Sequence, residues 1–425
     1  MPKMNLATFH QIFKDNWDDF KNLHPSYATP YYEEVMDKML RCGKEEGGFI
    51  EYHCTYCGQD YRRVAFSCKS SLCLRCGKVY SDNFVSQMSR VLQPGLRYRH
   101  MVLTIPEQLR IYFYRDSNKG DLLSSLMRIG YACLEDVVSR GVRQKVKIGA
   151  IVVVHTNGRS GHYNPHLHII MTSGGINEET GKWVELGYFP YEIIHKKWQY
   201  HLFKMLREKV NTVQMSRLLD RLYCKYPNGL VAHVSKGQVP EKCRGLAKYL
   251  GKYVASPPIA LSRIIKYTGN EVTYWYNDHH TGKKVVETVS VMLFIGRMVQ
   301  HILPKGFQRV RYYGLQATKT FKKWADAIKS GLQKVGRVIK GAYEIVADKG
   351  YRERYKEMSG LDPLKCIFCN REMDLWLIWH PKYGRIYDEY ENIKAGKYER
   401  IDGIGVSALR SPARGIQLSL FPLRL

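Results

Sequence analysis

The chain has 425 residues and a mass of 49.4 kDa, a length that exceeds one ordinary hydrophobic core and predicts roughly two to four packed units. Its 66 Lys and Arg residues against 39 Asp and Glu residues give a formal net charge of +27, which predicts a polyanionic partner such as nucleic acid. The most apolar stretch, residues 148–154, is far shorter than the roughly 20 residues that cross a bilayer, so we expect no membrane span and no membrane partner.

The cysteine content indicates a reducing compartment. Of the 11 cysteines, five fall between Cys54 and Cys76, a density typical of a metal cluster rather than of a disulfide framework. The N-terminus lacks the apolar core of a signal peptide. We therefore expect a cytoplasmic protein.

Two segments precede the largest predicted domain. Residues 1–46 have helical patterning with mixed charge, which predicts an N-terminal arm that packs against the rest of the chain or contacts DNA. Residues 47–95 contain the cysteine cluster followed by a polar helix, and we expect them to form a zinc-binding domain. At residue 98 the pattern changes to a strand that ends before Pro106, so a new domain begins there.

The zinc site is predicted from the spacing of two knuckles. Cys54-x2-Cys57 and Cys73-x2-Cys76 are separated by 15 residues, which allows four thiolates to surround one Zn²⁺ ion tetrahedrally. Four thiolates leave no open position for a substrate. We therefore expect this zinc to be structural, in a module that also contacts DNA.

The cysteines also leave alternatives open. Cys68 and His53 lie near the knuckles, so the identity of the fourth ligand is arguable, and ordinary buried cysteines are the alternative to a metal site. A further pair, Cys366-x2-Cys369, lies in the C-terminal tail region of residues 346–425. Two ligands cannot hold zinc, so this pair indicates ordinary packing unless His380 or a distant cysteine joins it.

Residues 96–262 are predicted to form an α+β domain, in which helices lie on one face of an antiparallel sheet. The strands are expected at residues 98–104, 148–156, 165–172 and 230–234. The helices are expected at residues 109–140, at residues 191–226 and from Pro240 to a point before Pro257. The turn-rich segment 157–161 joins the second and third strands, so we expect these strands to pair as a hairpin.

A histidine pair on this hairpin is a candidate metal site. His166 and His168 are two residues apart on a strand, so their rings share one face while Leu167 and Ile169 point into the core. The pair by itself is weak evidence, since histidines also occur on solvated strand faces. His155, at the end of the preceding strand, would fold back across the hairpin as a third ligand. Three imidazoles with open positions would suit Mn²⁺ as well as Mg²⁺, although Mg²⁺ prefers oxygen ligands.

A tyrosine pair is a candidate nucleophile. Tyr249 and Tyr253 are four residues apart in the helix predicted before Pro257, so both phenols lie on one helical face. A phenol with a pKa near 10 needs a metal-activated phosphate or a nearby cation to attack, and Lys248 and Lys252 flank the pair. Ordinary core packing is the alternative for two tyrosines at helical spacing.

Residues 263–345 are predicted to be a basic DNA-binding region. Further strands are expected at residues 263–276 and 284–291, and a helix near residues 293–303. The stretch 305–340 is thick with Lys, Arg and Tyr. The DNA contacts that we expect there are Lys305, Arg309 and Arg311, in addition to Lys248 and Lys252.

The order of these motifs resembles the two-tyrosine HUH transposases, and specifically the insertion-sequence ninety-one family. The resemblance rests on the zinc knuckles, His155-Thr156, Asn164-Pro165-His166-Leu167-His168, Tyr249-Leu250-Gly251-Lys252-Tyr253 before Pro257-Pro258-Ile259, and Leu303-Pro304-Lys305-Gly306-Phe307-Gln308-Arg309-Val310-Arg311-Tyr312-Tyr313-Gly314. It covers roughly residues 50–315. The first 46 residues and the region after Tyr313 carry little of it.

The resemblance implies a rolling-circle DNA transposase with an HUH endonuclease domain, acting on DNA in a bacterial cell. In that family the histidine pair binds a divalent metal, and a tyrosine forms a 5′-phosphotyrosine link that leaves a free 3′-hydroxyl. The matching residues are His166, His168, Tyr249 and Tyr253. Such enzymes act on single-stranded DNA at transposon ends and targets and use no ATP.

Two other functions compete with this one. A plasmid rolling-circle replication initiator or a relaxase shares the His-x-His and tyrosine chemistry, but the zinc cluster and the Pro-Lys-Gly-Phe segment favour the transposase. A non-catalytic zinc-dependent DNA-binding protein would need only the charge and the cysteines. The sequence does not specify an oligomeric state.

Overall fold

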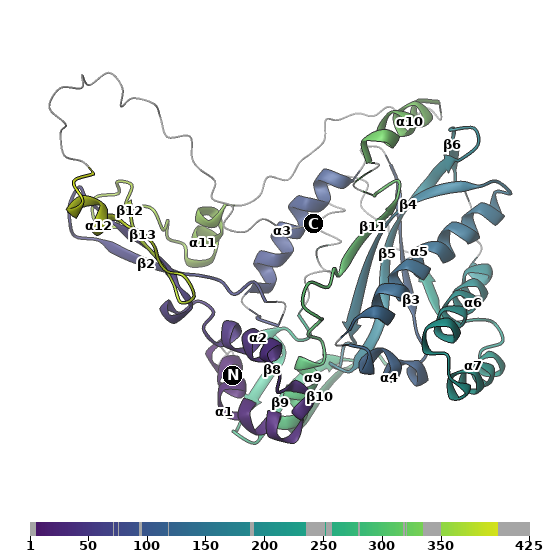
Figure 1. The fold of residues 1–425 in the computed structure, drawn as a ribbon, viewed down its shortest axis with the longest axis horizontal. Coiled ribbons are helices and arrows are strands. Elements are labelled where there is room, and N and C mark those ends of the chain that lie inside the picture. The colour runs from purple at the N-terminus through teal and green to yellow at the C-terminus, as the bar shows by residue number, and fades with distance from the viewer. Residues whose placement is uncertain are drawn as a thin grey trace. The chain divides into compact units, whose positions relative to one another are not determined.

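The structure is a computed structural model, and it describes residues 6–70, 72–74, 76–92, 96–117, 119–187, 191–234, 251, 257–278, 281–317, 319, 321–334 and 350–397. The chain divides into two compact units, one of Met1–Gly47 with Val64–Pro363 and one of Gly48–Arg63 with Leu364–Leu425 (Figure 1). None of the described helices is long and apolar enough to cross a membrane.

An antiparallel six-stranded sheet forms the centre of the first unit. Its strands are β3 (Tyr98–Thr104), β4 (Val146–Asn157), β5 (Tyr163–Asn177), β6 (Trp183–Glu185), β7 (Ala232–Val234) and β11 (Val310–Gly314). The order is β11-β4-β5-β3-β7, with β6 paired to β5, and each of these pairs is antiparallel. The α+β fold with an antiparallel sheet is therefore confirmed, and β4 and β5 form the predicted hairpin. Strand β11, which we expected in a separate basic region, belongs to this sheet.

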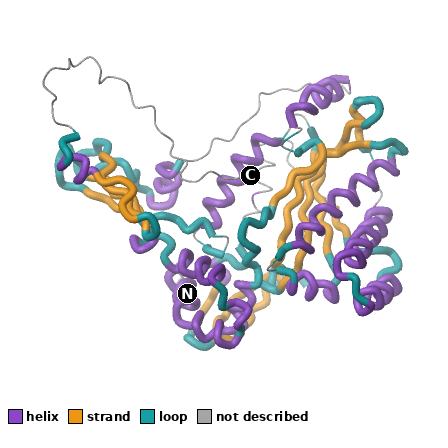
Figure 2. Tube along the Cα trace, viewed as in Figure 1, coloured by secondary structure: helices purple, strands orange, loops and turns teal. Residues whose placement is uncertain are grey.

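One face of the sheet is covered by α4 (Glu107–Arg115), α5 (Asp121–Gly141), α6 (Tyr191–Val210) and α7 (Val213–Lys225), as Figure 2 shows. Alternate residues of the hairpin, such as Val152 and Ile169, are fully buried against these helices. Trp198 of α6 is also fully buried, and its ring N–H donates to the carbonyl of Thr104 at 2.7 Å. The helices thereby fix the strands that carry the histidines.

Each of the two long helices predicted for this layer is interrupted. The helix predicted over residues 109–140 ends at Arg115, and α5 begins directly after Gly120, which adopts the left-handed conformation with φ 73°. The helix predicted over residues 191–226 breaks at Asn211, with φ 38°, and restarts where the hydroxyl of Thr212 accepts a hydrogen bond as the N-cap of α7. Local turn chemistry overrides the continuous apolar periodicity in both places.

The other face of the sheet is also covered, by α3 (Cys76–Val91) and α10 (Phe321–Lys334). Ile151, Val153 and Ile170 point to this face and pack with apolar residues of both helices. The prediction of helices on one face alone was wrong. Helix α3 lies within the expected zinc-binding domain of residues 47–95, and its apolar side packs against the sheet.

The N-terminal helices pack with residues that follow the predicted nuclease domain. The elements involved are α1 (Leu6–Leu23), η1 (Pro25–Tyr27), α2 (Pro30–Leu40), η2 (Glu45–Gly47), η3 (Leu261–Arg263), β8 (Ile264–Tyr267), β9 (Glu271–Asn277), β10 (Lys284–Ser290) and α9 (Val291–Val299). Strands β10-β9-β8 form a sheet, and its buried residues share one core with α1, α2 and α9. The first part of the expected basic region thus packs against the N-terminal arm. Helix α11 (Tyr351–Ser359) follows later in the same unit.

The second unit joins distant parts of the chain. Its four-stranded sheet has the order β13-β12-β1-β2, and its strands are β1 (Phe49–His53), β2 (Tyr61–Ala65), β12 (Asp374–His380) and β13 (Gly384–Asp388), followed by α12 (Glu389–Lys394). Strand β1 pairs antiparallel with β12. The first change of unit, between Gly47 and Gly48, falls at the expected start of the zinc-binding domain. Residues 48–63, however, belong to the same unit as part of the expected tail.

The helix predicted between Pro240 and Pro257 lies outside the described residues, except for Gly251, which is helical and buried. Tyr249, Tyr253, Lys248 and Lys252 all fall in this segment and are outside the described residues as well.

Gly130 of α5 allows close approach to the strand that carries His166 and His168. A Cβ added at Gly130 would come within 2.4 Å of Cδ1 of the fully buried Leu167. We expect Gly130→Val to lower the free energy of unfolding by about 1–3 kcal/mol through overpacking. Gly141→Val is the control, because a Cβ at this position in the same helix meets nothing within 4 Å. Chemical denaturation measures both variants, and equal stability would contradict the close contact.

Candidate metal centres

The hairpin brings the three predicted histidines together. His155 on β4 stands directly opposite His166 on β5, and His168 follows two residues later on the same face of the sheet. Each imidazole offers one nitrogen, and these three nitrogens all lie within 4.8 Å of one another. The cluster therefore has the compactness that a shared metal ion requires.

Hydrogen bonds orient two of the rings. The Nδ1–H of His166 donates to the carbonyl of Asn164 at 2.7 Å, which leaves its Nε2 as an unprotonated donor atom. That Nε2 faces the Nε2 of His168 at 3.2 Å. On its other side, Nδ1 of His168 is hydrogen bonded to Nε2 of His100 on β3 at 2.9 Å. The Nε2 atoms of His166 and His168 thus point toward one another, and in each ring the Nδ1 atom makes the hydrogen bond that fixes the ring's orientation.

The ring of His155 supplies a third nitrogen that could bind a metal. Nε2 of His155 is buried and has no hydrogen-bond partner among the described residues. Burial lowers the pKa of His155, His166 and His168, so all three are neutral at neutral pH. Neutral imidazole is the form that binds metals. The three residues therefore fit a divalent cation.

Two arginines add positive charge near the histidines. Beyond the effect of burial, His166 and Arg309 lower the pKa of His155, and Arg110 on α4 lowers that of His166. Arg309 was an expected DNA contact, whereas Arg110 was missed because a single arginine in a helix gives no sequence signal. Both positive charges lie where they can attract a phosphodiester.

The other expected DNA contacts lie elsewhere. The Lys305 side chain is 80% exposed, and its ammonium lies 4.0 Å from the carboxylate of Glu34. Arg311 pairs with Val152 in the sheet and donates to the hydroxyl of Ser124 on α5 at 2.8 Å, so it points to the face opposite the histidines.

The turn of the hairpin is anchored by the segment that follows α9. The side-chain amide of Gln300 donates to the carbonyl of Gly161 at 2.8 Å. The ring Nε2–H of His301 donates to the same carbonyl at 3.0 Å. Because Nε2 of His301 donates, its Nδ1 accepts from the hydroxyl of Thr156 at 3.1 Å. Thr156 is the neighbour of His155, so this network fixes the end of β4 that carries the third histidine.

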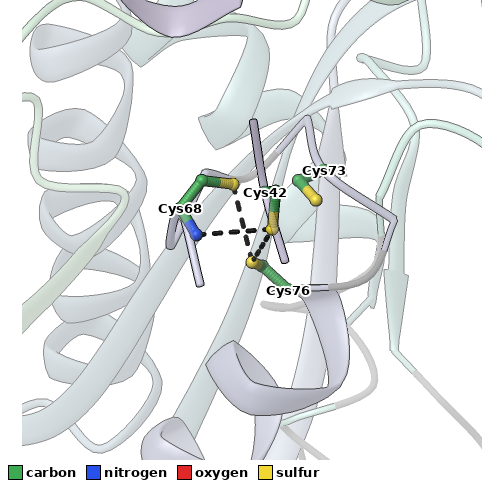
Figure 3. A group of neighbouring side chains, drawn as sticks. All are labelled: Cys42, Cys68, Cys73 and Cys76. Carbon is green, nitrogen blue, oxygen red and sulfur yellow. Dashed lines mark hydrogen bonds between the residues drawn. The ribbon is translucent and has the colours of Figure 1, made fainter. Parts of the chain in front are cut away.

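The cysteines form two groups, which corrects the predicted single site. Figure 3 shows the first, where Cys73 and Cys76 meet Cys42 and Cys68. Cys54 and Cys57 do not join them.

Cys54 and Cys57 meet the C-terminal pair Cys366 and Cys369 instead. The sequence spacing between the two knuckles misled us, because β1 and β2 carry Cys54 and Cys57 into the other unit. His53 is in neither group, since its Nε2 bonds the Glu51 carboxylate at 2.7 Å. Sequence reasoning missed Cys42, which stands outside any Cys-x2-Cys motif.

The first group has the dimensions of a zinc site. Sγ of Cys76 lies 3.5 Å from Sγ of both Cys42 and Cys68. Four sulfurs bound at about 2.3 Å to one tetrahedral ion lie about 3.8 Å apart. Backbone N–H groups of Cys68 and Ser70 donate to two of the sulfurs at 3.4 Å, which stabilises thiolates.

Two family models match this chain. The model described as "Transposase zinc-binding domain" matches residues 12–105, which contain the first cysteine group. The model described as "Putative transposase" matches residues 149–323, which contain the three histidines.

Two relatives are similar over most of their length. The "Transposase for insertion sequence element IS801" of Pseudomonas savastanoi pv. phaseolicola is 28% identical over 353 residues, or 80% of this chain and 82% of the relative. The "Putative transposase y4qJ" of Sinorhizobium fredii is 26% identical over 379 residues, or 85% of this chain and 92% of the relative. No solved structure matches this chain.

The fold, the metal-binding groups and these likenesses agree on one class of protein, so the chain is a transposase, an enzyme that cleaves and rejoins DNA. The comparisons bear out the resemblance to the insertion-sequence ninety-one family that the sequence motifs predicted, and residues 12–105 match a transposase zinc-binding domain. The comparisons do not support the alternatives of a plasmid initiator and of a non-catalytic DNA-binding protein.

The contact of His100 with His168 was not predicted from the sequence, and we expect it to orient the His168 ring. We expect His100→Ala to weaken Mn²⁺ binding roughly 10–100-fold, because Nδ1 of His168 loses the partner that orients the ring. His100→Gln supplies an amide oxygen in a similar place and is expected to restore part of the affinity. Calorimetric titration with Mn²⁺ measures both. Equal affinity of wild type and the alanine variant would contradict the role.

Proposed function

We propose that this transposase acts by a rolling-circle route, in which it cleaves and rejoins single-stranded DNA through 5′-phosphotyrosine intermediates. The observation that carries the proposal is the convergence of three neutral imidazoles beside Arg309 in a member of a two-tyrosine family. His155, His166 and His168 would hold Mn²⁺ or Mg²⁺, with three nitrogen donors favouring Mn²⁺. Such a cation polarises the scissile phosphodiester and orients it for in-line attack.

The tyrosines supply the covalent step. The phenolic oxygen of Tyr249 or Tyr253 attacks phosphorus, the bond from phosphorus to the 3′-oxygen breaks, and the phenol's proton ends on the released 3′-hydroxyl. One phosphodiester is exchanged for another, so the reverse attack by a 3′-hydroxyl reseals DNA and no ATP is consumed. With two tyrosines, one site can hold one strand end while it cleaves a second strand.

Basic side chains would hold the DNA backbone. The positive charge of Arg309 near His155 and the exposure of Lys305 support these two residues as backbone contacts. We also propose Lys248 and Lys252 as contacts, on the strength of their positions in the basic motif. The long-range attraction of the net charge of +27 favours the encounter with DNA.

We further propose that Cys42, Cys68, Cys73 and Cys76 bind one structural Zn²⁺ ion. Three of the four are buried in the core that α1, α2 and α9 share, and α3 begins at Cys76. The ion would therefore tie the N-terminal helices to the helix that covers the histidine face of the sheet.

Covalent DNA attachment tests the nucleophiles. Single-stranded DNA of the element's end, incubated with the full chain and Mn²⁺, is expected to form an adduct that survives denaturing electrophoresis. Tyr249→Phe or Tyr253→Phe alone should retain adducts, whereas the double variant should form none, because phenylalanine lacks the attacking oxygen. Tyr223→Phe, on the surface of α7, is the matched control. An adduct that survives the double change would sink the assignment.

Substitution of His155 tests the third ligand. We expect His155→Ala to weaken Mn²⁺ binding at least about 10-fold and to lower adduct formation correspondingly, since a ligand matters no less than its outer partners. His162→Ala is the control, because His162 lies in the turn of the same hairpin, exposed and bonded to Ser160. Unchanged affinity in the His155 variant would remove it from the ligand set.

A further inference from the structure

A second four-cysteine group combines residues from two segments that are far apart in the sequence. Cys54 and Cys57 follow β1, and Cys366 and Cys369 precede β12. Sγ of Cys54 lies 3.5 Å from Sγ of Cys57 and of Cys369, and Sγ of Cys57 lies 3.5 Å from Sγ of Cys366. A disulfide holds its sulfurs about 2.05 Å apart, so these are four separate thiols at the spacing of a shared ion.

The two knuckles have the same backbone shape. In each, the residue after the second cysteine is left-handed, with φ 68° at Gly58 and 58° at Asn370. The N–H of that residue donates to the carbonyl of the first cysteine, at 3.0 Å in both. N–H groups of Phe368 and Cys369 donate to Sγ of Cys366 at 3.4 and 3.5 Å. Such N–H to sulfur bonds favour the thiolate.

Strand pairing makes the meeting of the knuckles obligatory. In the antiparallel register, His53 at the end of β1 stands opposite Asp374 at the start of β12. The segment that leaves β1 and the segment that enters β12 therefore lie at the same edge of the sheet. The hydroxyl of Thr55 donates to Asp374, and the N–H of Ile367 donates to Asp60 at 3.0 Å. The first bond ties one knuckle to β12, and the second ties the other knuckle to the residue before β2.

The unit has little else to hold it. The buried cluster around the group contains Cys54, Cys366 and Met373. Among the other described residues of the unit and its four-stranded sheet, only Phe49, Val64 and Ile378 are buried and apolar. Units this small usually need metals or disulfides, because they bury too little apolar surface to offset the lost chain entropy. The unit thus has four sulfur atoms that could bind a metal ion and too small an apolar core to be stable without such a link.

We propose that Cys54, Cys57, Cys366 and Cys369 bind a second Zn²⁺ ion as four thiolates. The thiol protons pass to solvent as the ion binds. With four sulfur ligands the ion has no position for a substrate, so its role is to join the zinc-binding sequence to a C-terminal segment that lies beyond both family matches. The six cysteines of the N-terminal region thus serve two sites, and only the second depends on Cys366 and Cys369.

Site-resolved alkylation of the full-length, zinc-loaded protein tests this proposal. In wild type, iodoacetamide is expected to leave both four-cysteine groups unmodified, as read by peptide mass spectrometry. In the Cys366→Ser, Cys369→Ser double variant, Cys54 and Cys57 should react at least roughly 10-fold faster, and one zinc ion per chain should be lost. Cys73 and Cys76 should stay protected. Continued protection of Cys54 and Cys57, with an unchanged zinc content, would overturn the proposal.

Two controls separate loss of the ion from unfolding. Cys224→Ser removes an exposed cysteine of α7 that is in neither group, and it should change neither zinc content nor protection. Cys133 is fully buried in α5, so its alkylation would report global unfolding. If the double variant unfolds, ¹¹³Cd NMR of cadmium-loaded wild type decides the question. Two resonances of four-sulfur coordination are expected, and one alone would contradict the second site.

Discussion

The register of β4 against β5 is the constraint on which the histidine site depends. His155 faces His166 across the hairpin, and His168 follows on the same side because side chains alternate along a strand. A shift of one residue would turn every side chain of a strand to the opposite face. Leu167 and Ile169, fully buried against the helices, make such a shift costly. The hydrophobic core therefore sets the direction of the imidazoles.

The site is also supported from outside the nuclease sheet. His301 and Gln300, beyond β10, hold the carbonyl of Gly161 in the hairpin turn, and His301 also holds Thr156. The segment that supplies them follows α9, which packs with the N-terminal helices in one core. Residues outside the sheet that carries the histidines thus help to fix the geometry of the site, and the first four-cysteine group belongs to that same core.

The cysteines show how a fold can overrule spacing. Cys54 and Cys57 lie closer in sequence to Cys73 than to Cys366, yet strands β1 and β2 carry them into the unit that contains the C-terminal pair. Zinc imposes a tetrahedral arrangement but no order along the chain. The spacing of these cysteines is therefore compatible with one local site and equally with two interleaved sites. Only the pairing of the strands decides between the two arrangements.

The sequence by itself determined the antiparallel α+β domain, the hairpin, the shared face of His166 and His168, and the family, because these follow from short-range periodicity and from ordered motifs. Only the tertiary structure decided which cysteines meet, that His100 stands behind His168, and that helices cover both faces of the sheet. These features depend on contacts between residues far apart in the chain, and local patterns carry no information about which distant segments pair.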